Sequence, residues 1–145
     1  MRKILIPTVI ITILSFVSCK TTDKSNHSTE VTADMIDPEN PPIMEFEKET
    51  IEFNDIAIGS TYKDAFKFTN TGKTPLMLFD VKASCGCTVL NGWPKDPVAP
   101  GESAEIPFEF TPKVTGTNHK TISIVANTIP STKKLHIKGN VVGTE

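Results

Sequence analysis

The feature that most constrains the fold of this chain is a period of two in its apolar residues. In the stretch "SAEIPFEFTP", Ala104, Ile106, Phe108 and Phe110 share one parity, and Glu105, Pro107 and Glu109 take the other. The same alternation recurs in residues 62–68, 122–126 and 135–141. Because successive side chains of a β-strand point to opposite faces, the pattern predicts strands with one buried and one solvated face.

Clusters of Asn, Gly, Pro and Ser separate these runs, and such residues favour turns. They lie at residues 70–75, 99–103, 111–118 and 127–132. About seven short strands within roughly 100 residues are typical of an immunoglobulin-like antiparallel β-sandwich. No segment has the length and period of a competing helix. We therefore predict one all-β domain over residues 43–145.

Two local features refine this prediction. Pro107 has the parity of the solvated face, and proline cannot donate to a neighbouring strand, so its strand is expected at a sheet edge. The run "PLMLFDV" at residues 75–81 has four apolar residues in succession. It predicts either a strand buried on both faces or a β-bulge.

The cysteines exclude the antibody type of immunoglobulin domain, in which a disulfide joins two strands far apart in sequence around a central Trp. Here only Gly86 separates Cys85 from Cys87, and Trp93 follows them in a loop. The third cysteine, Cys19, lies outside the predicted domain.

Residues 1–18 have the features of an export signal. Met1–Lys3 is basic, and residues 4–17 are almost wholly apolar but shorter than the roughly 20 residues of a membrane-spanning helix. The stretch "FVSC" resembles a bacterial lipoprotein box, with Phe16 where leucine is usual, and predicts a lipoprotein signal peptide. We expect lipid on Cys19 to be the only membrane attachment, since no other segment is apolar enough to cross a bilayer.

Residues 19–42 are polar and end in prolines, a composition that predicts a lipidated N-terminus followed by a disordered tether. These predictions place the domain in the cell envelope, anchored to the inner or outer membrane and facing the periplasm or the cell surface. The formal net charge is −2 and no basic patch is present, which argues against nucleic acid as a partner.

Four motifs together resemble the bacterial domain of unknown function 1573 family. The most specific is "SCGCT" at residues 84–88, and it is supported by "FTNTG", "PGE" and "ANT". The likeness extends over residues 51–142. Members of that family resemble immunoglobulin-like domains of the ASH and major sperm protein type, and many are exported lipoproteins. The resemblance therefore implies a sandwich and a lipid anchor, and it implies no activity, substrate or catalytic residue.

Four interpretations compete for Cys85 and Cys87. In an extended segment both side chains project to one face, so a turn at Gly86 would allow a small-ring disulfide, which would suit disulfide exchange. As two thiolates, the pair would suit Cu(I). A nucleophile would need a base and an orienting group. We favour the remaining interpretation, in which the cysteines pack as small hydrophobes or form a passive local bridge.

A zinc site is not favoured, because structural zinc needs four ligands and the chain adds only three histidines to the pair. His27 lies in the tether, His136 has an outward parity, and His119 stands at the start of a strand with nothing to place it near the thiols.

Trp93, beside two prolines, is either an exposed aromatic contact for a partner or a lid on the core, and we favour the lid. Phosphate-binding loops, serine elbows and paired carboxylates are absent from the sequence. We therefore expect a non-enzymatic, lipid-anchored binding or assembly module without a cofactor, whose partner is an envelope protein or glycan. The alternative is a periplasmic thiol protein that binds Cu(I) or exchanges disulfides through Cys85 and Cys87.

Overall fold

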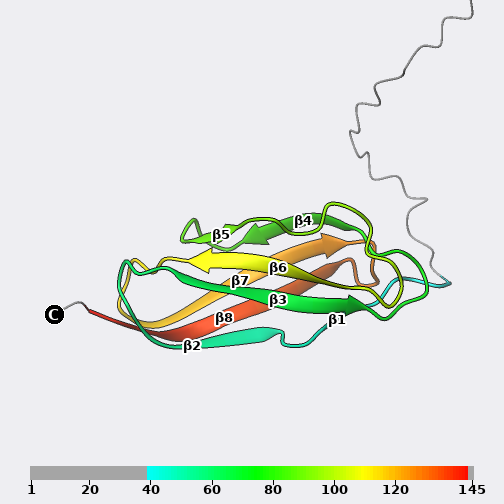
Figure 1. The fold of residues 1–145 in the computed structure, drawn as a ribbon. Helices are drawn as coiled ribbons and strands as arrows, with labels where there is room; N and C mark the ends of the chain where they lie inside the picture. The colour runs from blue at the N-terminus through cyan, green and yellow to red at the C-terminus, as the bar shows by residue number, and fades with distance from the viewer. Residues whose placement is uncertain (1–38, 144–145) are drawn as a thin grey trace, which may run out of the picture. The chain divides into compact units, whose positions relative to one another are not determined.

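A computed structural model describes residues 39–143 and folds them into two four-stranded sheets packed face to face (Figure 1). Sheet A has the order β1 (Met44–Phe46), β3 (Tyr62–Asn70), β6 (Ser103–Phe110) and β5 (Thr88–Leu90). Sheet B has the order β2 (Thr50–Ala57), β8 (Thr132–Val142), β7 (Gly116–Ala126) and β4 (Leu78–Ala83). The immunoglobulin-like sandwich expected from the sequence is confirmed, with eight strands in the described part of the chain instead of seven.

One strand pair departs from the antiparallel expectation. β2 runs parallel to β8, whereas the other strand pairs of both sheets are antiparallel. Parallel neighbours need a long connection that leaves the sheet. The five strands that lie between β2 and β8 in sequence provide that connection, because the chain passes through sheet A before it returns.

The alternating apolar residues form the core between the sheets, as their parity predicts. Phe66, Ile106, Phe108 and Leu135 are at most 1% exposed. The buried apolar side chains are Ile51, Phe53, Phe66, Phe68, Leu76, Leu78, Val81, Val98, Ile106, Phe108, Phe110, Ile122, Ile124, Ala126, Leu135, Ile137 and Val141. Both sheets contribute to this set, so the core lies in the space between them.

Gly139 allows β2 to pack closely against β8. It stands opposite Phe53 in the register of the two strands. A Cβ atom at residue 139 would collide with the phenyl ring and with the carbonyl oxygen of Phe53. The glycine is therefore required by close approach, since the ring occupies the space that a side chain would take.

Pro107 does not lie on an edge strand, because β6 has β3 on one side and β5 on the other. The backbone N–H of Thr111 donates to Cys87, so by alternation the odd-numbered residues of β6 face β5. β5 pairs only with residues 108–110 and ends before it reaches Pro107. The missing N–H of Pro107 thus points to a side where no strand continues, which explains why proline is tolerated on an inner strand.

The apolar run at residues 75–81 contains the β-bulge that was one of its two predicted interpretations. The pairing of β4 with β7 shifts register between Leu78 and Asp80. Before the strand begins, Leu76 forms an isolated bridge with Val98. The bulge allows both Leu78 and Val81 to point into the core although they are three residues apart.

Candidate functional site

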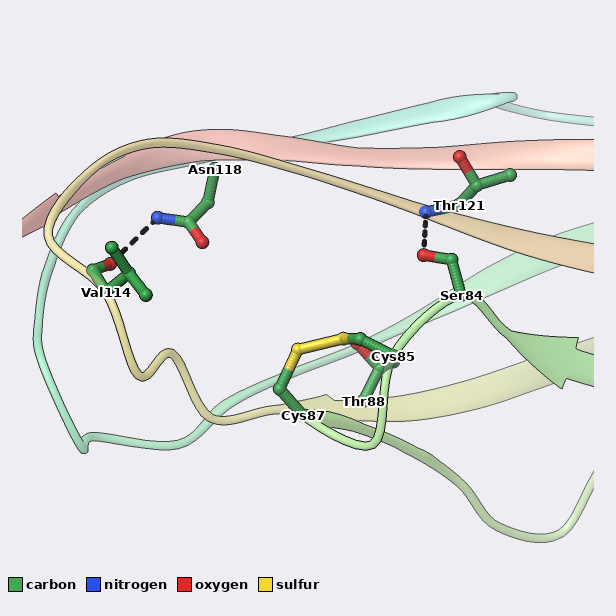
Figure 2. The surroundings of a disulfide bond; sticks show 7 residues. All are labelled: Ser84, Cys85, Cys87, Thr88, Val114, Asn118 and Thr121. Atoms are coloured by element: carbon green, nitrogen blue, oxygen red, sulfur yellow. Dashed lines mark hydrogen bonds between the residues drawn. A yellow bond between two sulfur atoms is a disulfide. The ribbon is translucent and has the colours of Figure 1, made fainter.

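Cys85 and Cys87 form a disulfide in the turn between β4 and β5 (Figure 2). Their Cα atoms are 5.3 Å apart. The N–H of Thr88 donates to the carbonyl oxygen of Cys85 over 3.3 Å, which closes the turn. Ser84, the residue before the disulfide, is held against β7, because its Oγ accepts a hydrogen bond from the N–H of Thr121. The structure thus contains a disulfide, which both the exchange interpretation and the passive-bridge interpretation include.

Gly86 lies in the turn that the sequence suggested, but without an unusual backbone angle. Its φ angle is not positive, and a Cβ atom there would meet no atom within 4 Å outside the two neighbouring residues. Both cysteines are half-buried.

A shallow cavity of about 240 Å³ lies beside the disulfide. Besides the residues of the disulfide turn, Lys113, Val114, Asn118 and Lys120 line it. Val114 is 67% exposed, and Asn118 ties its loop by donating to the carbonyl oxygen of Val114. Two ammonium groups and no carboxylate line this cavity, so it presents a positive potential to anything that approaches the sulfur atoms. We call this feature the disulfide hollow.

Neither described histidine lies in the disulfide hollow. His119 and His136 instead contact each other across β7 and β8, and the Nε2 atom of His119 lies 3.0 Å from the Nδ1 atom of His136. Within residues 39–143, no group of three or more His, Cys, Asp or Glu side chains has the arrangement of a metal site. A bonded pair also lacks the free thiolates that Cu(I) would need, so that interpretation requires prior reduction.

Trp93 packs against the hydrophobic core and is partly buried. The Nζ atom of Lys95 lies 2.8 Å from the centroid of the indole ring and covers its outer face. This position agrees with the favoured interpretation of Trp93 as a lid. A contact between Trp93 and a partner stays a prediction.

Three sequence predictions fall on parts of the chain that the structure does not describe. The signal peptide and Cys19 lie outside residues 39–143, as does the tether up to residue 38. In the part that is described, no helix is long and apolar enough to span a membrane.

The alternation pattern gave no indication that one edge of β3 is largely open. β1 pairs with only three residues of β3, from Phe68 to Asn70, and Glu47 adds one hydrogen bond to the carbonyl oxygen of Lys67. The N–H of Asn70 donates toward β6, so the even-numbered residues of β3 face β6 and the odd-numbered ones face away. The backbone groups of Lys63 and Ala65 therefore face the side where β1 has already ended.

A groove of about 450 Å³ runs beside this open edge, where the chain crosses from sheet A to sheet B. Its lining comes from two segments, residues 47–52 and residues 64–67. The charged side chains along it are Glu47, Lys48, Glu52, Asp64 and Lys67. Because both signs are interspersed, the groove has no strong preference for a charged ligand.

Asp64 covers part of the open edge. One of its carboxylate oxygens accepts from the N–H of Ala65 over 2.8 Å, and the other accepts from the hydroxyl of Tyr62 over 2.8 Å. Burial raises the pKa of Tyr62 to about 12, with added contributions from the hydrogen bond and the negative charge of Asp64. Natural edge strands use such charged side chains to discourage unspecific pairing.

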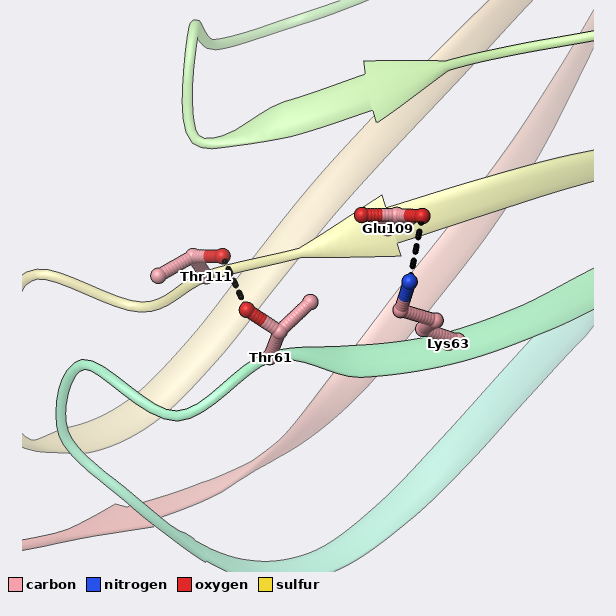
Figure 3. A network of polar contacts seen from close by, with 4 residues as sticks. All are labelled: Thr61, Lys63, Glu109 and Thr111. Carbon is pink, nitrogen blue, oxygen red and sulfur yellow. Dashed lines mark hydrogen bonds and ion pairs between the residues drawn. The ribbon is translucent and has the colours of Figure 1, made fainter.

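The side chain of Lys63 leaves the edge free. Its Nζ atom pairs with the carboxylate of Glu109 on β6 at 2.7 Å, and Figure 3 shows it directed across the sheet, toward β6. Close by, the hydroxyls of Thr61 and Thr111 are 3.0 Å apart and connect the same two segments. Lys63 is exposed and lies one residue before Asp64, where the lining of the groove begins on β3.

Comparison with known sequences identifies one family. The model of a family described as "Protein of unknown function (DUF1573)" matches residues 44–141, which include all but the final residue of the two sheets. None of the curated proteins matches the sequence.

Solved structures support the fold. PapD-like domain 7 of human CEP192, an ASH/PapD-like domain, is 12% identical, with a TM-score of 0.59, and the match covers 81% of this chain and 97% of that domain. A Porphyromonas gingivalis W83 protein of unknown function is 18% identical with a TM-score of 0.63, over 75% of this chain and 51% of the other. The secreted serine protease VesC from Vibrio cholerae is 11% identical with a TM-score of 0.57, over 68% and 23%. The chain thus spans about half of the second protein and a quarter of the third, and at these identities the likeness concerns the fold alone.

Proposed function

This chain belongs to the DUF1573 family, and we propose that it is a lipid-anchored cell-envelope protein whose sandwich binds a partner without catalysing a reaction. The observation that supports a binding role is the open edge of β3 beside its groove. An exposed sheet edge offers a row of backbone donors and acceptors, and an extended segment of another protein binds there by adding a strand. The partner in this proposal is an envelope protein, and a glycan is the less favoured choice because it has no matching backbone.

The added strand would extend sheet A along the line of β1. It would bond to the N–H and C=O groups of Lys63, and it would displace the carboxylate of Asp64 from the N–H of Ala65. Main-chain bonding explains how a groove of mixed charge could still hold a ligand. Specificity would come from alternate side chains of the added strand, which face the groove.

Proline at residue 65 provides a test that affects the edge and spares the fold. The N–H of Ala65 takes no part in the ladder with β6, so Ala65→Pro removes only the bond to Asp64 and places a ring where the new strand would lie. Ala83→Pro is the matched control. The backbone N–H of Ser84 donates to the carbonyl oxygen of Thr121 on β7, so by alternation the N–H of Ala83 faces away from β7. β4 is an edge strand of sheet B, whereas the groove lies beside β3 of sheet A.

The experiment uses two variants of the full chain in bacterial cells. One carries a photo-crosslinking residue in place of Lys67, which lines the groove, and the other carries it in place of Ser123, on the outer face of sheet B. We expect one envelope protein to crosslink at residue 67 and not at residue 123. Ala65→Pro should abolish that crosslink and Ala83→Pro should retain it. Equal crosslinking in both proline variants would contradict strand addition at β3.

The anchor is a separate part of the proposal and has its own test. Replacing Cys19 with Ser removes the thiol that would carry lipid, so the variant should move from the membrane fraction to the soluble fraction with its domain still folded. A Cys19→Ser variant that still sediments with membranes would show that the anchor lies elsewhere.

The half-exposed disulfide supports a second candidate function, thiol–disulfide exchange. A thiolate of a partner dithiol would attack one sulfur of the Cys85–Cys87 bond, which forms a mixed disulfide and releases the other cysteine as a thiolate. The partner's second thiolate then attacks the partner's own sulfur in the mixed disulfide. The partner leaves as a disulfide, and Cys85 and Cys87 are both left reduced, as thiolates. Lys113 and Lys120 would favour the thiolates in this sequence, because nearby cations stabilise negative sulfur.

Alkylation of the purified protein before and after reduction, read by intact mass, tests this candidate. We expect both cysteines to react only after reduction. Equilibration with glutathione buffers then gives the reduction potential. A potential below about −300 mV, in the range of structural disulfides, would eliminate exchange as a function and leave a passive bridge.

A further inference from the structure

The histidine pair on the outer face of sheet B has no part in the proposed binding edge or in the disulfide hollow. His119 lies on β7 and His136 on β8, and in the antiparallel register His136 stands opposite Thr121. The two histidines are therefore diagonal neighbours with the same outward parity. Both rings are accessible, because His119 is exposed and His136 is half-buried.

The two imidazoles direct ring nitrogens at each other. The Nε2 atom of His119 and the Nδ1 atom of His136 are 3.0 Å apart, and the ring centroids are 5.0 Å apart with planes inclined by 42°. A hydrogen bond of this kind uses one proton, donated by one ring and accepted by the lone pair of the other. Replacing that proton by a cation would turn both nitrogens into acceptors of the same ion.

The separation of the nitrogens matches a chelate. Zinc–imidazole bonds are about 2.0–2.1 Å long, so two cis ligands at angles between about 90° and 110° have nitrogens roughly 2.9–3.4 Å apart. The observed 3.0 Å falls in that range without movement of the backbone. Small rotations of the accessible rings would be enough to make the two lone pairs converge on one point.

We propose that His119 and His136 form a two-imidazole site for a divalent transition-metal ion, Cu²⁺ or Zn²⁺, with water completing the coordination. Neutral imidazole is a common ligand for both ions, and Cu²⁺ binds such donors most tightly in the first-row series. In the strand register Lys138 stands opposite His119, and Glu52 stands beside Lys138 on β2. The acidic side chain offsets the charge of Lys138, and Lys134 is a second exposed lysine, two residues before His136 with the same outward parity.

The test is a titration of the full chain, prepared without a polyhistidine tag and with its disulfide intact, with Cu²⁺ alone. We expect one equivalent to bind and the electron paramagnetic resonance spectrum to show two nitrogen ligands. Because the second imidazole acts at high effective concentration, His119→Gln and His136→Gln should each weaken binding by about 100-fold. Glutamine keeps a polar partner on the strand, and thermal unfolding checks that each variant is folded.

His27 provides the matched control, since it is the only other histidine of the chain. His27→Gln should leave the affinity for Cu²⁺ unchanged. The proposal is overturned if wild-type protein binds no Cu²⁺ at millimolar concentration. It is equally overturned if the His119→Gln/His136→Gln double variant binds as tightly as wild type, or if His27→Gln alone removes binding. Zn²⁺ competition against bound Cu²⁺ then ranks the two ions.

Discussion

The side chain of Asn70 fixes the turn after β3, and its removal allows a quantitative test of the fold that holds the open edge. It is fully buried, with 0% of its surface exposed. Its Nδ2 group donates to the carbonyl oxygens of Thr74 and Val98 at 2.8 and 3.0 Å, and its Oδ1 accepts from the N–H of Gly72 at 3.1 Å. One side chain thus connects the end of β3 to two other segments.

The expected cost follows from these three bonds. Each contributes about 1 kcal/mol net to stability, so Asn70→Ala should lower the free energy of unfolding by about 3 kcal/mol. The carbonyl oxygen of Val98 is not left without a partner by this change, because it also accepts from the N–H of Leu76. For a domain of about 100 residues, 3 kcal/mol corresponds to a fall in Tm of roughly 12–24 °C.

Urea denaturation followed by tryptophan fluorescence measures this change. Thr69→Ala, one residue earlier on β3, is the matched control. Its hydroxyl also makes a hydrogen bond, to Ser103 at 2.8 Å, but in an exposed position, so the loss should be within about 0.5 kcal/mol. If Asn70→Ala costs less than about 1 kcal/mol, or no more than Thr69→Ala, the assigned role of the buried amide is wrong.

Three further predictions concern single groups. Tyr62 is the only tyrosine, so phenolate absorbance should titrate near pH 12 in the folded protein and near pH 10 in denaturant. Because the pKa of Tyr62 is higher in the folded state, its contribution to the stability of the fold is fully present below about pH 10 and is lost as the pH rises toward 12. A midpoint at pH 10 in the folded protein would contradict this. Gly139→Ala should destabilise by about 1–3 kcal/mol in a thermal melt, whereas Gly86→Ala should be nearly neutral, and equal effects would argue against close packing at residue 139. Cys85→Ser/Cys87→Ser should cost only about 1.5 kcal/mol in urea, since the closed loop is very short, and a loss of folding would assign the bridge a larger structural role.

The core and the layer arrangement could be predicted from the sequence because they depend on parity. Alternation alone assigned Ile106, Phe108 and Phe110 to the interior, and all three are buried. The same reasoning placed the side chain of Pro107 outward and inferred an edge strand, which was wrong. Parity says which face a residue occupies, and it does not say which strands are neighbours or where a neighbouring strand ends.

The candidate sites depend on that missing information. The sequence suggested a turn at Gly86, and the disulfide is local, so it was within reach of sequence reasoning. The open edge arises because β1 is three residues long and β3 is nine, a difference in length that no pattern in residues 43–70 encodes. The contact between His119 and His136 requires the β7–β8 register, which depends on the length of the connecting turn.

The most direct test of strand addition at β3 is amide hydrogen exchange of the backbone, measured residue by residue in the free protein and with the crosslinked partner bound. In the free protein, the N–H of Lys63 should exchange rapidly while those of Asp64 and Phe66, which face β6, are protected. Binding of the partner should then protect Lys63. An N–H of Lys63 that is already protected in the free protein, or that still exchanges rapidly in the complex, would contradict the proposal that the partner adds a strand to sheet A.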